Sequence, residues 1–482
     1  MISKNFQEEI IKKIFNFLEI KYPLEEFTKL YDLEGGYAFK SQTYSDKGIF
    51  VLRVTNIEKN SEINKEDVKY FPEDQIDTQL KKYLLKVGDV LVVMVGGSLG
   101  KVGFVKNKDV PAILNQNMWR VRSSKEKMNP KYTYYLTRYI NHSKIKIKSS
   151  THGHMSREMY RQIKIPHIDE KTQDLIADYL DNLFLENPCK IPSFLLELKS
   201  KIDKIVLLNN FYLESVSLNK DNKNYINKLR QQILQEAVQG KLISQDPKDE
   251  PASELLKKIK AEKDKLIRDG KIKKQKPLDS ISEDEIPYEL PKGWEWVRLG
   301  DICDYGSSDK TEGKNLKDNV WVLDLEDIES ISSKLIAKIR FLDRKSKSTK
   351  NIFYKGDVLF NKLRPYLDKV LVADESGVCT TEILPLRVFG NNLNPFYLRW
   401  FLKSPSLMSY INSVTYGMKM PRLGTEDGKK ALIPLPPLPE QKRIVEKVDK
   451  LIVYCNELEK QVKENQENSE KLVGAVLKES FA

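Results

Sequence analysis

The hexapeptide Lys86-Val87-Gly88-Asp89-Val90-Leu91 decides the organisation of this chain, because a close copy, Tyr354-Lys355-Gly356-Asp357-Val358-Leu359, follows 268 residues later. Further landmarks recur in the same order with nearly the same offset. An ordered series of this kind indicates an internal duplication. The paired landmarks are Asn129-Pro130 and Asn394-Pro395, Met155-Ser156-Arg157 and Met420-Pro421-Arg422, Ile165-Pro166 and Ile433-Pro434, and Gln173 and Gln441.

Each half combines a strand-rich segment with a long helix. Runs such as 90–95 and 358–360 have the short apolar pattern of buried strands that end in turns. The helical segments have apolar residues spaced alternately four and three apart, which is the seam of a coiled coil. The seam residues are Leu195, Leu198, Ile202, Ile205, Tyr212 and Val216 in the first half, and Ile444, Val448, Leu451, Cys455, Leu458, Val462, Leu472 and Val476 in the second.

We therefore expect an α+β fold with two tandem pseudo-repeated domains, mixed and strand-rich, separated by long antiparallel coiled-coil helices. The predicted segments are a first domain (1–168), a central helical spacer (169–245), a basic Pro-containing linker (246–289), a second domain (290–438) and a distal spacer helix (439–482). Periodicity alone leaves an alternative open, in which each helix simply packs on its own globular domain.

The linker predicts a short helix with many lysines. Capping chemistry at Ser253 and Glu254 opens it, and Gly270 can close it. Its lysines continue into Lys271, Lys273, Lys274 and Lys276. Such a run fits a solvated face and non-specific contact with DNA phosphates equally well.

Composition limits the class of protein. The 482 residues carry a net charge of +12, which suits a polyanionic partner such as nucleic acid. The four cysteines are scattered without a C-x-x-C pair, which argues against a zinc module or a disulfide framework. No apolar run approaches the roughly 20 residues of a membrane span, and the start of the chain lacks an apolar signal segment, so we expect a cytoplasmic protein.

Three tracts resemble the specificity subunits of type I restriction–modification systems. They are Leu290-Pro291-x-Gly293-Trp294-x-Trp296-Val297-x-Leu299-Gly300-Asp301, Pro434-Leu435-Pro436-Pro437-Leu438-Pro439-Glu440-Gln441-x-Arg443-Ile444-Val445, and the central tract 229–242. The resemblance spans nearly the whole chain. It is weaker at the start, where the residues before Tyr22 lack the opening seen at Trp294 to Asp301.

The resemblance implies two target-recognition domains, each reading one half of a bipartite, asymmetric DNA target. It also implies that two modification (methyltransferase) subunits, which carry the S-adenosylmethionine site, dock on the helices, and that restriction (translocase/endonuclease) subunits join the complex. The chain itself would be non-catalytic and hold no cofactor. The recognition subunit of a restriction system that cuts on both sides of its target would look the same.

Base reading needs Arg, Lys, Asn or Gln side chains on exposed loops. The candidate DNA-binding residues in the first half are Gly97, Ser98, Lys101, Asn115, Gln116, Arg157 and Arg161. In the second half they are Asn361, Lys362, Arg364, Tyr366, Lys369, Thr381, Lys419 and Arg422. The repeat pairs Arg157 with Arg422, so these two suit phosphate contacts shared by both halves. For any one of these residues, a structural role at the surface is an equal alternative.

Other sites fit poorly. A methyltransferase would need a glycine-rich cofactor loop and an N/D-P-P-Y/F tetrapeptide, and neither occurs. Asp301 with Glu312 and Lys314 matches a D…E-x-K nuclease spacing, but we expect Glu312 to lie in a polar stretch without a strand. His152 and His154 lack further metal ligands nearby. The alternative function is a coiled-coil scaffold that binds nucleic acid without sequence preference.

Overall fold

A computed structural model describes residues 2–58, 60–95, 98–123, 128–145, 155–306, 309–415 and 421–479. The chain forms two compact units, one made of residues 1–217 with 466–482 and the other of residues 218–465. No helix in the described ranges is long and apolar enough to cross a membrane.

The first unit is built on two larger sheets and a two-stranded antiparallel sheet of β1 and β9. The four-stranded sheet has the order β2-β8-β5-β6, with every neighbouring pair antiparallel, and the three-stranded sheet has the order β4-β3-β7, with β3 and β7 parallel. The strands are β1 (Leu24–Glu26), β2 (Tyr31–Gly35), β3 (Ile49–Leu52), β4 (Tyr70–Phe71), β5 (Val90–Val93), β6 (Val102–Phe104), β7 (Ala112–Leu114), β8 (Met118–Ser123) and β9 (Lys164–Pro166).

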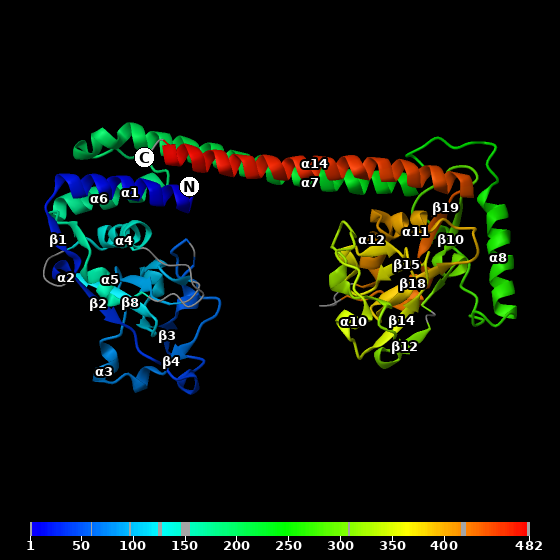
Figure 1. Ribbon diagram of the computed structural model, residues 1–482, viewed down its shortest axis with the longest axis horizontal. Coiled ribbons are helices and arrows are strands. Elements are labelled where there is room, and N and C mark those ends of the chain that lie inside the picture. Colours follow the sequence, from blue (N-terminus) through cyan, green and yellow to red (C-terminus); the bar gives the residue numbers. More distant parts are fainter. Residues whose placement is uncertain are drawn as a thin grey trace. The chain divides into compact units, whose positions relative to one another are not determined.

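Helices complete this unit. Both α1 and α6 pack on α4 (Figure 1). The apolar side chains of all three helices are buried in one core. The helices are α1 (Lys4–Lys21), α2 (Phe27–Leu30), α3 (Thr78–Lys81), α4 (Pro130–Tyr139), α5 (Arg157–Arg161) and α6 (Glu170–Phe184). A π-helical turn, Ile140–Lys144, follows α4.

The second unit repeats this frame. Its sheet β11-β18-β15-β16 matches β2-β8-β5-β6, and the parallel pair β13 and β17 matches β3 and β7. The strands are β10 (Glu295–Arg298), β11 (Cys303–Tyr305), β12 (Lys310–Glu312), β13 (Trp321–Leu323), β14 (Thr349–Phe353), β15 (Val358–Asn361), β16 (Val370–Val372), β17 (Gly377–Thr380), β18 (Ile383–Val388) and β19 (Leu432–Leu435). The helices are α8 (Ala252–Arg268), α9 (Leu299–Ile302), α10 (Phe341–Arg344), α11 (Pro395–Leu402), α12 (Pro405–Val414) and α13 (Thr425–Lys430).

The duplication extends to individual side chains. Gln173 Oε1 accepts the Asn129 N–H at 2.9 Å, and Gln441 Oε1 accepts the Asn394 N–H at 2.8 Å, just before α4 and α11 respectively. In the repeated hexapeptides, Gly88 and Gly356 have φ of +90° and +93°. These turns require a left-handed residue, which explains the glycine in both copies.

The long helices α7 (Lys199–Val238) and α14 (Leu438–Glu479) each contribute residues to both units, and they contact each other within each unit. In the first unit Ser215 Oγ donates to Ser469 Oγ at 3.1 Å. In the second unit Arg230 donates to Glu459 at 2.8 Å. A later residue on α7 therefore contacts an earlier residue on α14, so the two helices are antiparallel, as predicted.

The seam prediction is only partly right. In the first half, Leu195, Leu198, Ile202 and Ile205 are buried in the first unit's own core, as the alternative proposed, and the helical region is interrupted between α6 and α7. Val216, Leu458 and Leu472 are exposed, so assigning them to the seam was wrong. A two-helix pair covers only one face of each helix, and these side chains lie outside that face.

The predicted linker contributes to the second unit. Its helix, α8, buries Ala252, Leu255 and Ile259 in the second core and is followed by Gly270 with φ of +69°. The capping prediction was wrong, because the N-cap is Pro251 and Ser253 lies inside the helix. A proline fits this end, where backbone N–H groups have no helical partner.

Candidate nucleic-acid interface

Three loops of the second unit meet where β15 ends. The Lys362 N–H donates to Glu382 O at 3.1 Å, the Leu423 N–H donates to Lys362 O at 3.0 Å, and the Arg364 N–H donates to Pro421 O at 2.8 Å. The structure therefore brings together five of the predicted residues, which we call the second loop cluster: Lys362, Arg364, Tyr366, Thr381 and Arg422.

Within the second loop cluster the side chains differ in exposure. Tyr366 is 53% exposed, whereas Lys362, Arg364 and Thr381 are half-buried. Arg422 is exposed, and its guanidinium donates to Glu382 Oε1 at 2.8 Å. Sequence reasoning missed Glu382, because nothing in the chain links two residues separated by 40 positions.

Two other predicted residues of this half serve the fold. Asn361 is buried and its Oδ1 accepts the Leu363 N–H at 3.1 Å. The Lys369 ammonium donates to Leu325 O at 2.7 Å. Their positions give no support to the prediction that they contact DNA. Lys419 lies outside the described residues.

The first unit has the equivalent arrangement. The Met94 N–H donates to Asn117 O at 3.0 Å, and the Met155 N–H donates to Met94 O at 2.9 Å, which are the counterparts of the Lys362 and Leu423 bonds. The first loop cluster therefore contains Ser98, which is half-buried, and Gln116, which is exposed. Gly97 lies outside the described residues.

The remaining predicted residues of the first half also divide into those with a structural role and those that are exposed. Asn115 is buried, and the Lys101 ammonium donates to Ile57 O at 3.2 Å. Lys101 and Lys369 stand at equivalent positions and each donates to a backbone carbonyl, although the two carbonyls, Ile57 O and Leu325 O, are not equivalent, so both lysines stabilise the fold. Arg161 is exposed and pairs with Glu158 at 3.2 Å.

Arg157 opens α5 beside a polar cavity of about 370 Å³ that Glu34, Lys82, Tyr83 and Arg120 also line. It is not the counterpart of Arg422, contrary to the sequence pairing. The shared bond to Met94 O and Lys362 O makes Met155 equivalent to Leu423, which places Arg422 before the second copy of this segment. A three-residue slip in the repeat produced the wrong pairing.

These loops lie on two copies of one frame, and a family model accounts for both copies. The model, described as the type I restriction modification DNA specificity domain, matches residues 19–193 and 291–467. The chain belongs to this family.

Individual relatives cover different shares of this type I specificity chain. The EcoAI specificity subunit of Escherichia coli is 38% identical over 265 residues, which are 52% of this chain and 44% of the relative, so the chain spans less than half of it. The EcoBI specificity subunit of the same organism is 21% identical over 463 residues, 93% of this chain and 83% of the relative. A solved chain from a study of the type I R-M system covers 95% of this chain and 97% of its own length, with a TM-score of 0.49 and 15% identity, a likeness too weak to bear on function.

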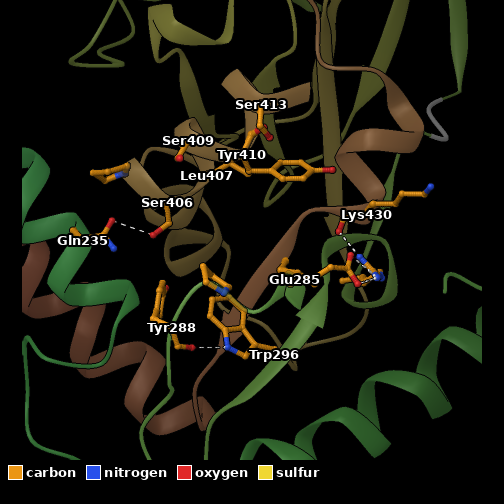
Figure 2. Close-up of a pocket in the computed structure, with 14 residues that line it drawn as sticks. Gln235, Glu285, Tyr288, Trp296, Ser406, Leu407, Ser409, Tyr410, Ser413 and Lys430 are labelled. Atoms are coloured by element: carbon orange, nitrogen blue, oxygen red, sulfur yellow. Dashed lines mark hydrogen bonds and ion pairs between the residues drawn. The ribbon is translucent and has the colours of Figure 1, made fainter. Parts of the chain in front are cut away.

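A separate cavity of about 680 Å³ lies in the second unit of this specificity chain (Figure 2). Tyr288, Trp296 and Tyr410 supply aromatic walls, and Arg298 is held by Glu285 at 2.9 Å. Figure 2 also shows Ser406 donating to Gln235, at 3.0 Å. None of the predicted DNA-binding residues lines this cavity, so it is not the predicted interface.

The described part of this specificity chain offers no support for a nuclease or a metal site. Asp301 pairs with Lys263 at 3.4 Å, and Glu312 pairs with Lys314 at 2.8 Å. Glu312 does lie on a strand, β12, so the prediction of a strandless stretch was wrong. No group of three metal-ligating side chains occurs among the described residues, and His152 and His154 lie outside them.

Proposed function

We propose that this chain is the sequence-specific DNA-binding subunit of a type I restriction–modification complex. Each unit reads one half of a bipartite, asymmetric target through its loop cluster, and the chain itself performs no catalysis. The observation that carries the proposal is the contrast between a repeated frame and unlike loops. The frame keeps the Gln173 and Gln441 contacts in both units, whereas equivalent loop positions carry Ser98 and Tyr366, or Gln116 and Thr381.

Two units that share a fold but carry different loop residues suit an asymmetric target. A side chain on a loop can read base edges in the major groove, and a different side chain at the equivalent position reads a different base. Contacts to phosphate fix the protein on the duplex without reading sequence. The net charge of +12 supplies the general attraction to DNA that both kinds of contact need.

We further propose that two modification subunits, which hold S-adenosylmethionine, dock on the long helices. Large apolar side chains on these helices remain exposed, among them Phe211 at 60% on α7 of the first unit and Tyr454 at 67% on α14 of the second. Exposed apolar groups of this kind mark protein–protein contacts when they gather on one element. The others are Leu207, Leu213, Val216, Leu218, Tyr225, Leu229, Val453, Leu458 and Leu472. Restriction subunits would join the complex to cut DNA.

The experiment that tests the reading function is co-expression with the methyltransferase partner, followed by genome-wide mapping of methylated bases by single-molecule sequencing. We expect a split motif methylated on both strands. Exchange of residues 22–165 for those of another such chain should change one half of the motif only. A partner that is active with another specificity subunit but gives no motif with this chain would favour the non-specific scaffold.

The docking proposal is tested separately by co-purification. Tyr454→Lys should reduce recovery of the methyltransferase with this chain, because a charge in an apolar contact is desolvated without a partner. Lys460→Gln, at an exposed residue that pairs with Glu464 on the same helix, is the control. Equal recovery with Tyr454→Lys and wild type would place the contact elsewhere.

A further inference from the structure

A buried ammonium joins two loops of the second unit. The side chain of Lys403, which follows α11, is only 4% exposed. It donates to Ile331 O at 2.8 Å, to Ser333 Oγ at 2.8 Å and to Asp368 O at 3.2 Å, and it forms an ion pair with Asp368 Oδ2 at 2.8 Å. One side chain therefore holds residues 331–333 against the loop that carries Arg364 and Tyr366.

Both of these loops have unusual backbone conformations. Arg364 and Asp368, on either side of the turn Pro365–Leu367, have φ of +51° and +52°. In the other loop, Ile331 and Ser333 have φ of +69° and +55°. Residues other than glycine adopt this region at an energetic cost and keep it only when surrounding contacts impose it, commonly at functional sites.

We infer that Lys403 and Asp368 are positioning residues, which hold the loop Arg364–Asp368 in the conformation that reads the second half of the DNA target. This inference rests on the proposed function and names the residues that determine its specificity in one unit. The exposed Tyr366 and the half-buried Arg364 are the reading groups of this loop. Lys403 and Asp368 act through them and do not touch DNA.

The first unit shows what the ion pair replaces. Asp368 corresponds to Gly100, which has φ of +79°, in a β5–β6 loop of the same length. Glycine adopts this conformation without strain, so the first unit needs no ion pair like that of Lys403 and Asp368 to hold its loop. Lys403 corresponds to Arg138, whose guanidinium turns to Glu8 of α1 at 2.9 Å. Loss of the ion pair between Lys403 and Asp368 should therefore affect only the second half of the target.

The test measures base preference and stability together. The chain with Lys403→Met is co-expressed with its methyltransferase partner, and the methylated motif is mapped genome-wide beside that of the wild type. Lys350→Met is the matched control, because Lys350 is also 4% exposed and its ion-pair partner, Asp324 at 2.7 Å, lies outside the loop Arg364–Asp368. Thermal unfolding of both variant complexes gives their stability.

We expect Lys403→Met to lower base discrimination at one or more positions of the second half-site by about tenfold, the size of one lost base contact. The first half-site should be unchanged. Lys350→Met should lower the unfolding temperature similarly and keep the complete motif. Wild-type preference in the second half-site of Lys403→Met would overturn the positioning role, as would the same relaxation in Lys350→Met. Failure of the proposed function is a different result, since the wild-type complex would then give no split motif.

Discussion

Arg422 offers a test of how the loops hold DNA. Its guanidinium is exposed and is steered by Glu382 at 2.8 Å, which suits contact with a phosphate. An exposed ion pair contributes little to folding, so Arg422→Gln should leave the unfolding temperature nearly unchanged. Any effect on DNA binding can then be read as loss of a contact with DNA.

The magnitude follows from counterion release. Loss of one phosphate contact makes the slope of log K against log salt less negative by about 0.9, which corresponds to about fivefold weaker binding near 0.15 M salt. The loss should be equal on target and non-target duplexes. Because the single variant removes the cation that pairs with the Glu382 carboxylate and leaves that negative charge near the phosphate, its loss should exceed that of the double variant Glu382→Gln with Arg422→Gln.

The assay is a salt titration of duplex binding by the complex of this chain with its methyltransferase. Lys199→Gln is the control, since it removes one exposed charge that pairs with Asp203 on α7. An unchanged salt slope with Arg422→Gln would refute the phosphate contact. A loss confined to one base position of the target would instead assign Arg422 to base reading.

Three further predictions concern single side chains of the second unit. Gln441→Ala should destabilise that unit by about 1–3 kcal/mol in thermal unfolding, because it leaves the Asn394 N–H and Pro436 O without their buried partner. Arg364→Ala should relax the preference for one base of the second half-site, and unchanged affinity and preference would refute that assignment. Burial raises the pKa of Asp368 to about 6, against the opposing effect of Lys403 and Arg399, so base preference in the second half should fall below that pH and be independent of pH in Asp368→Asn. Because the pKa of Asp368 is higher in the folded than in the unfolded chain, the stability that this carboxyl contributes is lost as pH rises through about 6. Acid should therefore weaken base reading in the second half, and protonation of Asp368 should not unfold the chain.

Local chemistry explains why the frame could be predicted. In the repeated hexapeptide, Asp89 accepts the Lys86 N–H and Asp357 accepts the Tyr354 N–H, both at 2.8 Å. The turn is therefore written in a few consecutive residues, together with its glycine. A signal of this kind survives in both copies and reveals the duplication without any knowledge of tertiary contacts.

The interface could be predicted only in part, because residue type does not reveal a distant partner. Lys369 and Tyr366 are both plausible DNA contacts by their chemistry and lie three positions apart. The structure gives Lys369 a carbonyl partner 44 positions away, and leaves Tyr366 exposed. The coiled-coil period has the same limit. It groups Leu458 with Val462 on one face, but it cannot tell which of the two the partner helix covers.

The loops themselves show why specificity is harder to read than fold. At the same point of the repeat, one unit uses Gly100 and the other uses Asp368 held by Lys403. Glycine obtains the left-handed conformation from its own lack of a side chain, whereas aspartate depends on a lysine beyond the next helix. A domain that changes its target must alter its loops while keeping its frame. Contacts from distant residues, such as that of Lys403 with Asp368, can hold a changed loop in place without altering the rest of the fold. Such contacts leave no local pattern in the sequence. Base preference in the second half should therefore depend on residues such as Lys403 that no loop motif contains.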